Sequence, residues 1–230
     1  MAIRAVFFDL FETLVTEFAD GRRLSNRRYD YEKLLGLTEK QFKGEWKLRQ
    51  ERRMNGTFAA FPDVIRDIAA ANRLSVEEDA IEMLHQGRLN EKRIPFREIR
   101  PDIIALLEAL RERGLTIGLI SNCTPEEVAA WQDSPLSAHV DDAVFSFEAR
   151  CSKPDPAIYL LACGRLRVKP DEALFVGDGG SDELEGADRA GLRAYHAFWF
   201  NTYIESRFEK LKAPGELLRV VGEGGREAGA

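Results

Sequence analysis

Three acidic side chains and one lysine stand at places where a folded chain would bring them together. Asp9 follows one short apolar segment, Asp178 and Asp182 follow another, and Lys153 lies in a loop between the two segments. Three carboxylates in one crevice repel one another unless a cation shares the site. Mg²⁺, a hard cation with oxygen ligands, meets that need, together with Lys153. An aspartate held beside a metal and a lysine can attack phosphorus or carbon and form a covalent intermediate.

A hydroxyl and an amide follow a third apolar segment. Ser121 and Asn122 could donate hydrogen bonds to phosphate or carboxylate oxygens. The structural alternative is that they cap a helix that we expect from Pro125 onward. Both interpretations place them at the end of a strand.

The other candidate residues also have structural alternatives. Lys153 could be a solvated loop lysine, although the prolines of Ser152-Lys153-Pro154-Asp155-Pro156 stiffen that loop. Asp182 could interact with a helix dipole, and it could do so while ligating a metal. The glycines around Asp178 do not form a nucleotide-binding motif and are expected to allow a tight turn.

The segments that must position these side chains read as buried strands separated by helices. Most of them are short apolar runs, which are typical of strands covered on both faces. Strands alternating with helices predict an α/β fold with a doubly wound, mostly parallel sheet, whose ligand crevice lies at the carboxyl ends of the strands. The predicted strands are Ala5 to Phe8, Leu115 to Ile120, Ala143 to Ser146, Ala173 to Val176 and Arg193 to Ala197.

Residues 16–94 have a helical pattern and predict an inserted helical domain. Ser75 with Glu78 reads as a capping box that opens its last helix. Three arginines, Arg49, Arg52 and Arg53, could form a cationic lid with nearby aromatic residues, or they could be a solvated basic helix face over an aromatic core.

The predicted division is a core of residues 1–15 and 95–213, the helical domain 16–94, and a tail of residues 214–230. The tail is expected to be partly disordered, with one short helix near residues 216–220.

Composition narrows the function classes. The chain of 230 residues has a net charge of -6, which argues against nucleic acid as its partner. Its three cysteines have neither disulfide nor zinc spacing, and no apolar run is long enough to cross a membrane. We expect a cytoplasmic monomer or homodimer that acts on a small molecule.

The order of these segments resembles the haloacid dehalogenase superfamily of aspartate-nucleophile hydrolases, over the chain up to about residue 200. The resemblance implies that Asp9 is the nucleophile, that Ser121 and Lys153 hold the substrate, and that Asp178 and Asp182 bind the metal. Asn122 and Thr13 are expected to contact the substrate as well. The helical insertion resembles the cap that closes over the crevice in this family.

One position departs from the family's phosphatases. They carry a second aspartate two residues after the nucleophile, as general acid and base, whereas this chain has Phe11. Loss of such a group typically slows a reaction by roughly 10²- to 10⁴-fold. Glu12 is one residue too far along to replace it, but the backbone carbonyl of Phe11 can still ligate Mg²⁺, and its ring could contact the substrate.

An aromatic residue at this position resembles the 2-haloacid dehalogenases, which have tyrosine there and use no metal. Those enzymes have serine and asparagine where this chain has Asp178 and Gly179. We therefore expect a Mg²⁺-dependent phosphomonoesterase acting on a small anionic metabolite through an aspartyl phosphate. The alternatives are a 2-haloacid dehalogenase and a weakly active binding protein with the same fold.

Overall fold

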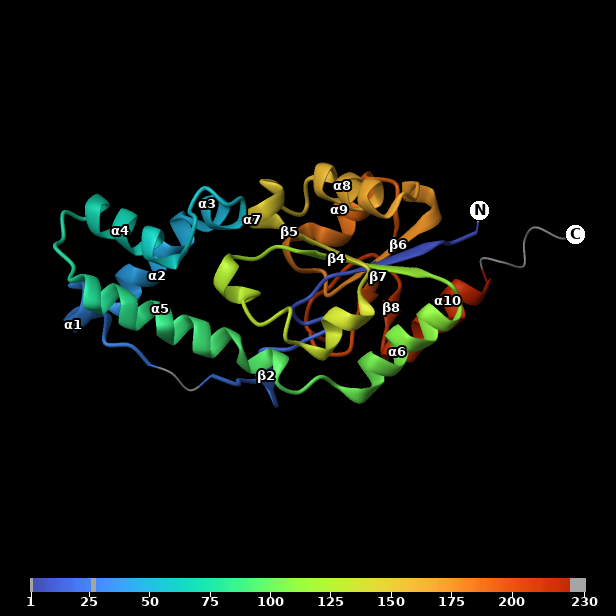
Figure 1. Ribbon diagram of the computed structural model, residues 1–230, viewed down its shortest axis with the longest axis horizontal. Helices are drawn as coiled ribbons and strands as arrows, with labels where there is room; N and C mark the ends of the chain where they lie inside the picture. Colours follow the sequence, from blue (N-terminus) through green and yellow to red (C-terminus); the bar gives the residue numbers. More distant parts are fainter. Residues whose placement is uncertain (1, 26–27, 224–230) are drawn as a thin grey trace, which may run out of the picture.

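A six-stranded parallel sheet forms the centre of the computed structural model, which describes residues 2–25 and 28–223 (Figure 1). Its strand order is β5-β4-β1-β6-β7-β8, and every neighbouring pair is parallel. This confirms the doubly wound α/β fold. The strands are β1 (Ala5–Phe8), β4 (Thr116–Ser121), β5 (Asp142–Phe145), β6 (Ala173–Gly177), β7 (Arg193–Ala197) and β8 (Lys210–Leu211).

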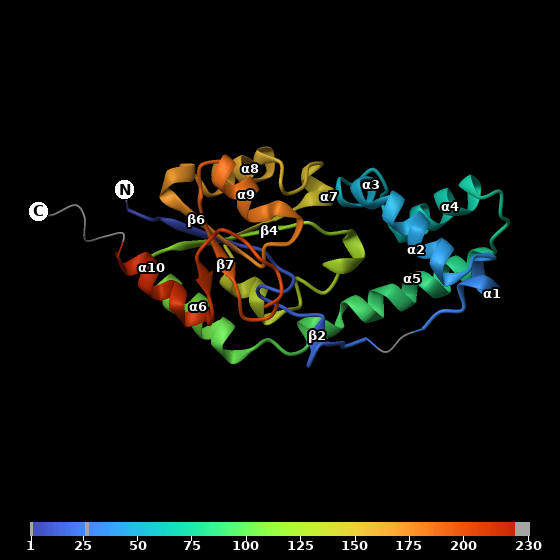
Figure 2. The ribbon, with the colours of Figure 1, turned by 180° about the vertical axis from the view of Figure 1, so that it is seen from behind.

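Strand β1 lies in the middle of the sheet and is fully buried, because β4 and β6 pair with its two edges and helices cover both faces. Helices α6 (Pro101–Glu112) and α10 (Leu217–Glu223) lie on one face, and α8 (Pro156–Leu166) and α9 (Glu183–Arg189) lie on the other (Figures 1 and 2). Val6 and Phe8 belong to the apolar cluster on the α6 face of the sheet, and Ala5 and Phe7 belong to the cluster on the α8 face. This alternation explains why the β1 segment is apolar at every position.

The cap helices lie to one side of the sheet and have an apolar core of their own, with Ile65 and Ile68 among its most buried side chains (Figure 2). A short antiparallel ribbon, β2 (Phe18–Ala19) with β3 (Arg22–Arg23), precedes them and was not predicted. The cap helices are α1 (Tyr31–Leu35), α2 (Glu39–Leu48), α3 (Gln50–Met54), α4 (Phe61–Ala71) and α5 (Glu78–Lys92).

The three cap arginines do not form a free cationic lid or a solvated face. Arg49 is buried and pairs with Glu45 and Asp67, and the exposed Arg52 also pairs with Asp67. Arg53 is buried with its guanidinium carbon 3.8 Å from the centre of the Trp46 ring.

The predicted helix from Pro125 onward is wrong. That segment contains only the short turns η2 (Pro125–Glu127) and η3 (Pro135–His139). Pro135 disfavours helical geometry in the residue before it, and Trp131 packs into the sheet's apolar cluster. The other short elements are η1 (Ile94–Phe96), α7 (Ser146–Ala149), η4 (Pro170–Glu172), η5 (Gly180–Asp182) and η6 (Pro214–Glu216).

The predicted capping box of Ser75 is also wrong, because the chain stays extended through Glu77 and α5 begins at Glu78 without a side-chain cap. Val76 packs against the cap core, which keeps this stretch out of the helix.

The beginning of the predicted tail is ordered, because Leu217 of α10 is fully buried. Residues 224–230 lie outside the described part of the chain. Among the residues that are described, no helix combines the length and the apolar character that a membrane span requires.

Candidate active site

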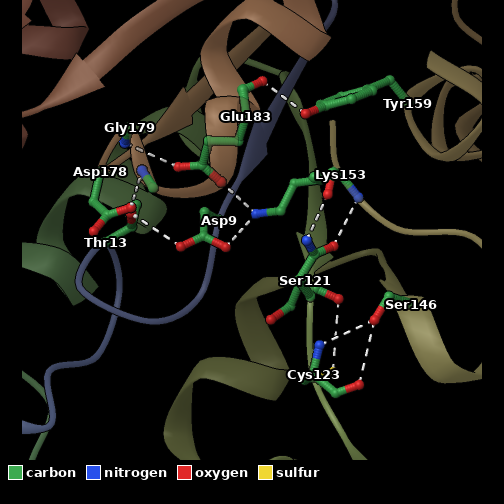
Figure 3. A network of polar contacts seen from close by, with 12 residues as sticks. Asp9, Thr13, Ser121, Cys123, Ser146, Lys153, Tyr159, Asp178, Gly179 and Glu183 are labelled. Atoms are coloured by element: carbon green, nitrogen blue, oxygen red, sulfur yellow. Dashed lines mark hydrogen bonds and ion pairs between the residues drawn. The ribbon is translucent and has the colours of Figure 1, made fainter. Parts of the chain in front are cut away.

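Asp9 lies just past the end of β1, where its backbone N–H donates to the carbonyl of Val176 at 2.9 Å. Its carboxylate forms an ion pair with Lys153 and accepts a hydrogen bond from the hydroxyl of Thr13 at 3.4 Å (Figure 3). A turn over the next residues brings Thr13 back toward Asp9, since the N–H of Leu14 donates to the carbonyl of Leu10. Both oxygens of Asp9 therefore have a fixed donor.

Lys153 reaches Asp9 from the loop between β5 and α8, and its side chain is 3% exposed. The amide of Asn122 fixes this loop by exchanging two hydrogen bonds with the backbone of Lys153, each 2.8 Å long. Although burial alone would lower the pKa of Lys153, Asp9 and Glu183 raise it above its ordinary value. The ammonium is therefore charged. Both polar atoms of the Asn122 side chain are used in holding the backbone of Lys153.

Glu183, which the sequence analysis missed, lies with Asp9 and Asp178, whereas Asp182 is exposed. One oxygen of Glu183 accepts from Lys153 at 2.5 Å and the other accepts from the N–H of Gly179 at 3.1 Å (Figure 3). Asp182 has a positive φ of 52° and precedes α9, so that Glu183 is the first helical residue and faces inward. This geometry decides between two adjacent acidic residues that the sequence does not distinguish.

Asp178 follows β6, and each of its oxygens has one donor. The N–H of Gly180 donates to one oxygen at 2.9 Å, and the side-chain amide of Asn201 donates to the other at 2.8 Å. One oxygen from each of Asp9, Asp178 and Glu183 lies within 4.8 Å of the others. Three oxygen ligands at this separation with a surplus of negative charge fit a hard divalent cation such as Mg²⁺.

The same crowding changes how these acids titrate. Burial, with Asp9 nearby, raises the pKa of Glu183 from its ordinary 4.5 to about 8. Burial also raises the pKa of Asp9, with Lys153 opposing this effect and Asp178 adding to it. Without a cation, the cluster therefore holds a proton near neutral pH.

Ser121 ends β4, and its hydroxyl is buried with no hydrogen-bond partner in the described part of the chain. The following turn is held by Ser146, which accepts from the N–H of Cys123 at 3.0 Å and donates to its carbonyl at 3.3 Å (Figure 3). A buried hydroxyl without a partner is costly, so this one is available to a bound ligand.

Phe11 provides no proton donor. Its half-buried ring packs edge-on against the ring of Phe96, with the two ring centres 6.3 Å apart. The ammonium of Lys92 lies 5.6 Å from the centre of the Phe11 ring. Glu12 does not replace the missing acid, because its two oxygens accept hydrogen bonds from Thr16 and from the backbone of Glu17. The contribution of the Phe11 carbonyl to a metal site stays a prediction.

Comparisons with known proteins identify the family of this chain. A family model described as haloacid dehalogenase-like hydrolase matches residues 3–191. A glyceraldehyde 3-phosphate phosphatase from Methanopyrus kandleri is 38% identical over 40% of this chain and 40% of its own length. The (S)-2-haloacid dehalogenase 2 from a Pseudomonas species is 30% identical over 96% of this chain and 93% of its own.

Several of the curated relatives match over less than half of their own length, between 40% and 45%. Among solved structures, a haloacid dehalogenase family enzyme from Bacteroides thetaiotaomicron, in a magnesium complex, covers 86% of this chain and 94% of its own, with a TM-score of 0.59 and 20% identity. That likeness supports the fold. The family match spans most of the chain, and the protein therefore belongs to the haloacid dehalogenase-like hydrolases.

Proposed function

We propose that this hydrolase is a Mg²⁺-dependent phosphomonoesterase acting on small anionic metabolites. One observation carries the proposal: Asp9, Asp178 and Glu183 share one small site with Lys153. With all four groups ionised the site has a net charge of -2, which a divalent cation would neutralise. A 2-haloacid, which brings its own carboxylate, would be repelled by such a site in the absence of metal.

Asp9 is the proposed nucleophile. Its attack on phosphorus would give an aspartyl phosphate, while Lys153 and the free hydroxyl of Ser121 hold the transferring oxygens. Asp9, Asp178 and Glu183 would hold the metal, which supplies charge neutralisation to the phosphoryl group. Asp182, predicted as a ligand, is replaced in this proposal by Glu183.

The phosphatase relative supports phosphoryl transfer, but the dehalogenase relative keeps a second candidate open. The observation that favours a 2-haloacid dehalogenase is Phe11, whose aromatic ring takes the place of a general acid. Displacement of halide from carbon needs the nucleophile but no protonation of the leaving group.

A panel of phosphorylated metabolites, assayed with Mg²⁺ for release of phosphate, tests the proposal. Turnover by the wild type that is lost in Asp9→Asn would support it. Asp182→Asn is the matched control, because this exposed acid lies outside the cluster and its loss should leave turnover unchanged. No phosphate release from any member of the panel would contradict the proposal and favour the binding-protein alternative.

A further inference from the structure

The loop after β7 contacts the candidate active site at two places, near Asp9 and at Asp178. The indole N–H of Trp199 donates to the backbone carbonyl of Thr13 at 2.8 Å, and Thr13 in turn donates to Asp9. Two residues later, the amide of Asn201 donates to Asp178 at 2.8 Å. No residue of this loop was predicted from the sequence to belong to the active site.

Asn201 is 6% exposed, and its carbonyl oxygen Oδ1 is buried without a donor among the described residues. The orientation of the amide follows from its partner, because the carboxylate of Asp178 only accepts hydrogen bonds and must face the Nδ2 group. Leaving a buried carbonyl oxygen unpaired is costly. A group that arrives with a ligand is therefore expected to donate to it.

We propose that Asn201 is a positioning residue of the cation site: its Nδ2 group orients Asp178, and its Oδ1 accepts a hydrogen bond from a water molecule bound to the cation. The inference rests on the proposed function, since it requires a cation at the three carboxylates. Mg²⁺ usually keeps several of its waters when it binds to proteins, and these waters need acceptors. Mutation of a residue that hydrogen-bonds to a metal ligand typically lowers metal affinity by about 10- to 100-fold.

The expected loss is partial, because Asp178 keeps its bond from the N–H of Gly180 when Asn201 is changed. We expect Asn201→Ala to weaken Mg²⁺ binding by about tenfold, the lower end of the usual effect. Asn201→Ser should weaken binding as well, since its hydroxyl ends one bond short of the position of Nδ2 and does not reach Asp178. Asn72→Ala is the matched control, because Asn72 caps its own cap helix by donating to the carbonyl of Ile68.

The experiment is calorimetric titration of the whole protein with Mg²⁺, without substrate. Melting temperatures of the metal-free proteins show whether each variant is folded. Weaker binding in Asn201→Ala, with Asn72→Ala like the wild type, would support the inference. If Asn201→Ala does not fold, weaker binding by a folded Asn201→Ser decides in its favour.

Two results would overturn the inference, and they are distinct from failure of the proposed function. The first is wild-type affinity in a folded Asn201 variant when Asp178→Asn abolishes binding. The second is an equal loss of affinity in Asn201→Ala and Asn72→Ala, which would indicate general destabilisation. If the wild type itself binds no Mg²⁺, the proposed metal dependence fails, and the positioning role fails with it.

Discussion

Glu183 is the residue whose ionisation should report most directly on the cation. Its pKa of about 8 in the folded protein lies above the ordinary 4.5, so the metal-free folded state binds more protons than the unfolded chain between these values. Stability contributed by the protonated form is present below pH 4.5 and is lost as the pH rises toward 8. Denaturant unfolding of metal-free protein across this range should show that decline, and Glu183→Gln should remove it.

Binding of Mg²⁺ should have the opposite pH dependence, because the ligand must lose its proton. Below pH 8 the apparent affinity is expected to fall by about tenfold per pH unit as one proton is displaced. Calorimetry in two buffers of different ionisation enthalpy measures this proton directly. Release of no proton at pH 7 would show that Glu183 is already ionised in the metal-free site.

Phe11 is expected to limit the reaction by failing to protonate the leaving group. Phe11→Asp should raise activity on alkyl phosphates by roughly 10²-fold or more, and much less on an activated aryl phosphate, whose leaving group departs unaided. Steady-state rates on one substrate of each kind, with Mg²⁺ present, give the ratio. An unchanged rate on the alkyl phosphate would show that Phe11 is not the limiting defect.

Helix α5 joins the cap to the core through ion pairs. Arg88 donates to Glu127 at 2.9 Å, and Lys92 pairs with Glu127 at 3.1 Å and with Glu17 at 2.6 Å. Burial alone would raise the pKa of Glu127, but Lys92 and Arg88 lower it to about 2. The stability that the ionised carboxylate of Glu127 contributes is therefore present above pH 4.5 and is lost as the pH falls toward 2.

Removing the charge of Glu127 should leave two cations on α5 facing the core with fewer partners. We expect Glu127→Gln to lower the free energy of unfolding by on the order of 3 kcal/mol, measured with urea at pH 7. Glu39→Gln is the control, since its pair with Lys43 is exposed on one helix surface and contributes little. Equal stability of the two variants would contradict a buried link between cap and core.

At the same scale, the sequence predicted the longer elements and missed those that depend on distant contacts. The five predicted strands are four to six residues long, whereas β8 is two residues long and exists because it pairs with β7. The position of Glu183 could not be predicted because two consecutive residues, Ser181 and Asp182, adopt a left-handed backbone conformation. This conformation is unusual for residues other than glycine. Asn201 was missed because it belongs to no strand end.

For the whole molecule, burial of the site constrains access. Asp9 is 7% exposed and Lys153 is 4% exposed, and the loops after β1 and β4 lie between the sheet and the cap helices. We expect substrates to be small and the cap to move relative to the sheet during turnover. Because the chain has a net charge of -6, we expect local cations, and not long-range attraction, to hold the proposed anionic substrate.

The central claim is that Asp9 attacks phosphorus in a metal-dependent step. Its most direct test is the mass of the intact protein, quenched in acid after mixing with acetyl phosphate, whose leaving group needs no proton donor. Because Phe11 cannot activate water either, the aspartyl phosphate should accumulate in the wild type with Mg²⁺. It should be absent with a chelator and in Asp9→Asn. An unmodified wild type in Mg²⁺, together with halide release from a 2-haloacid in excess chelator, would contradict the claim.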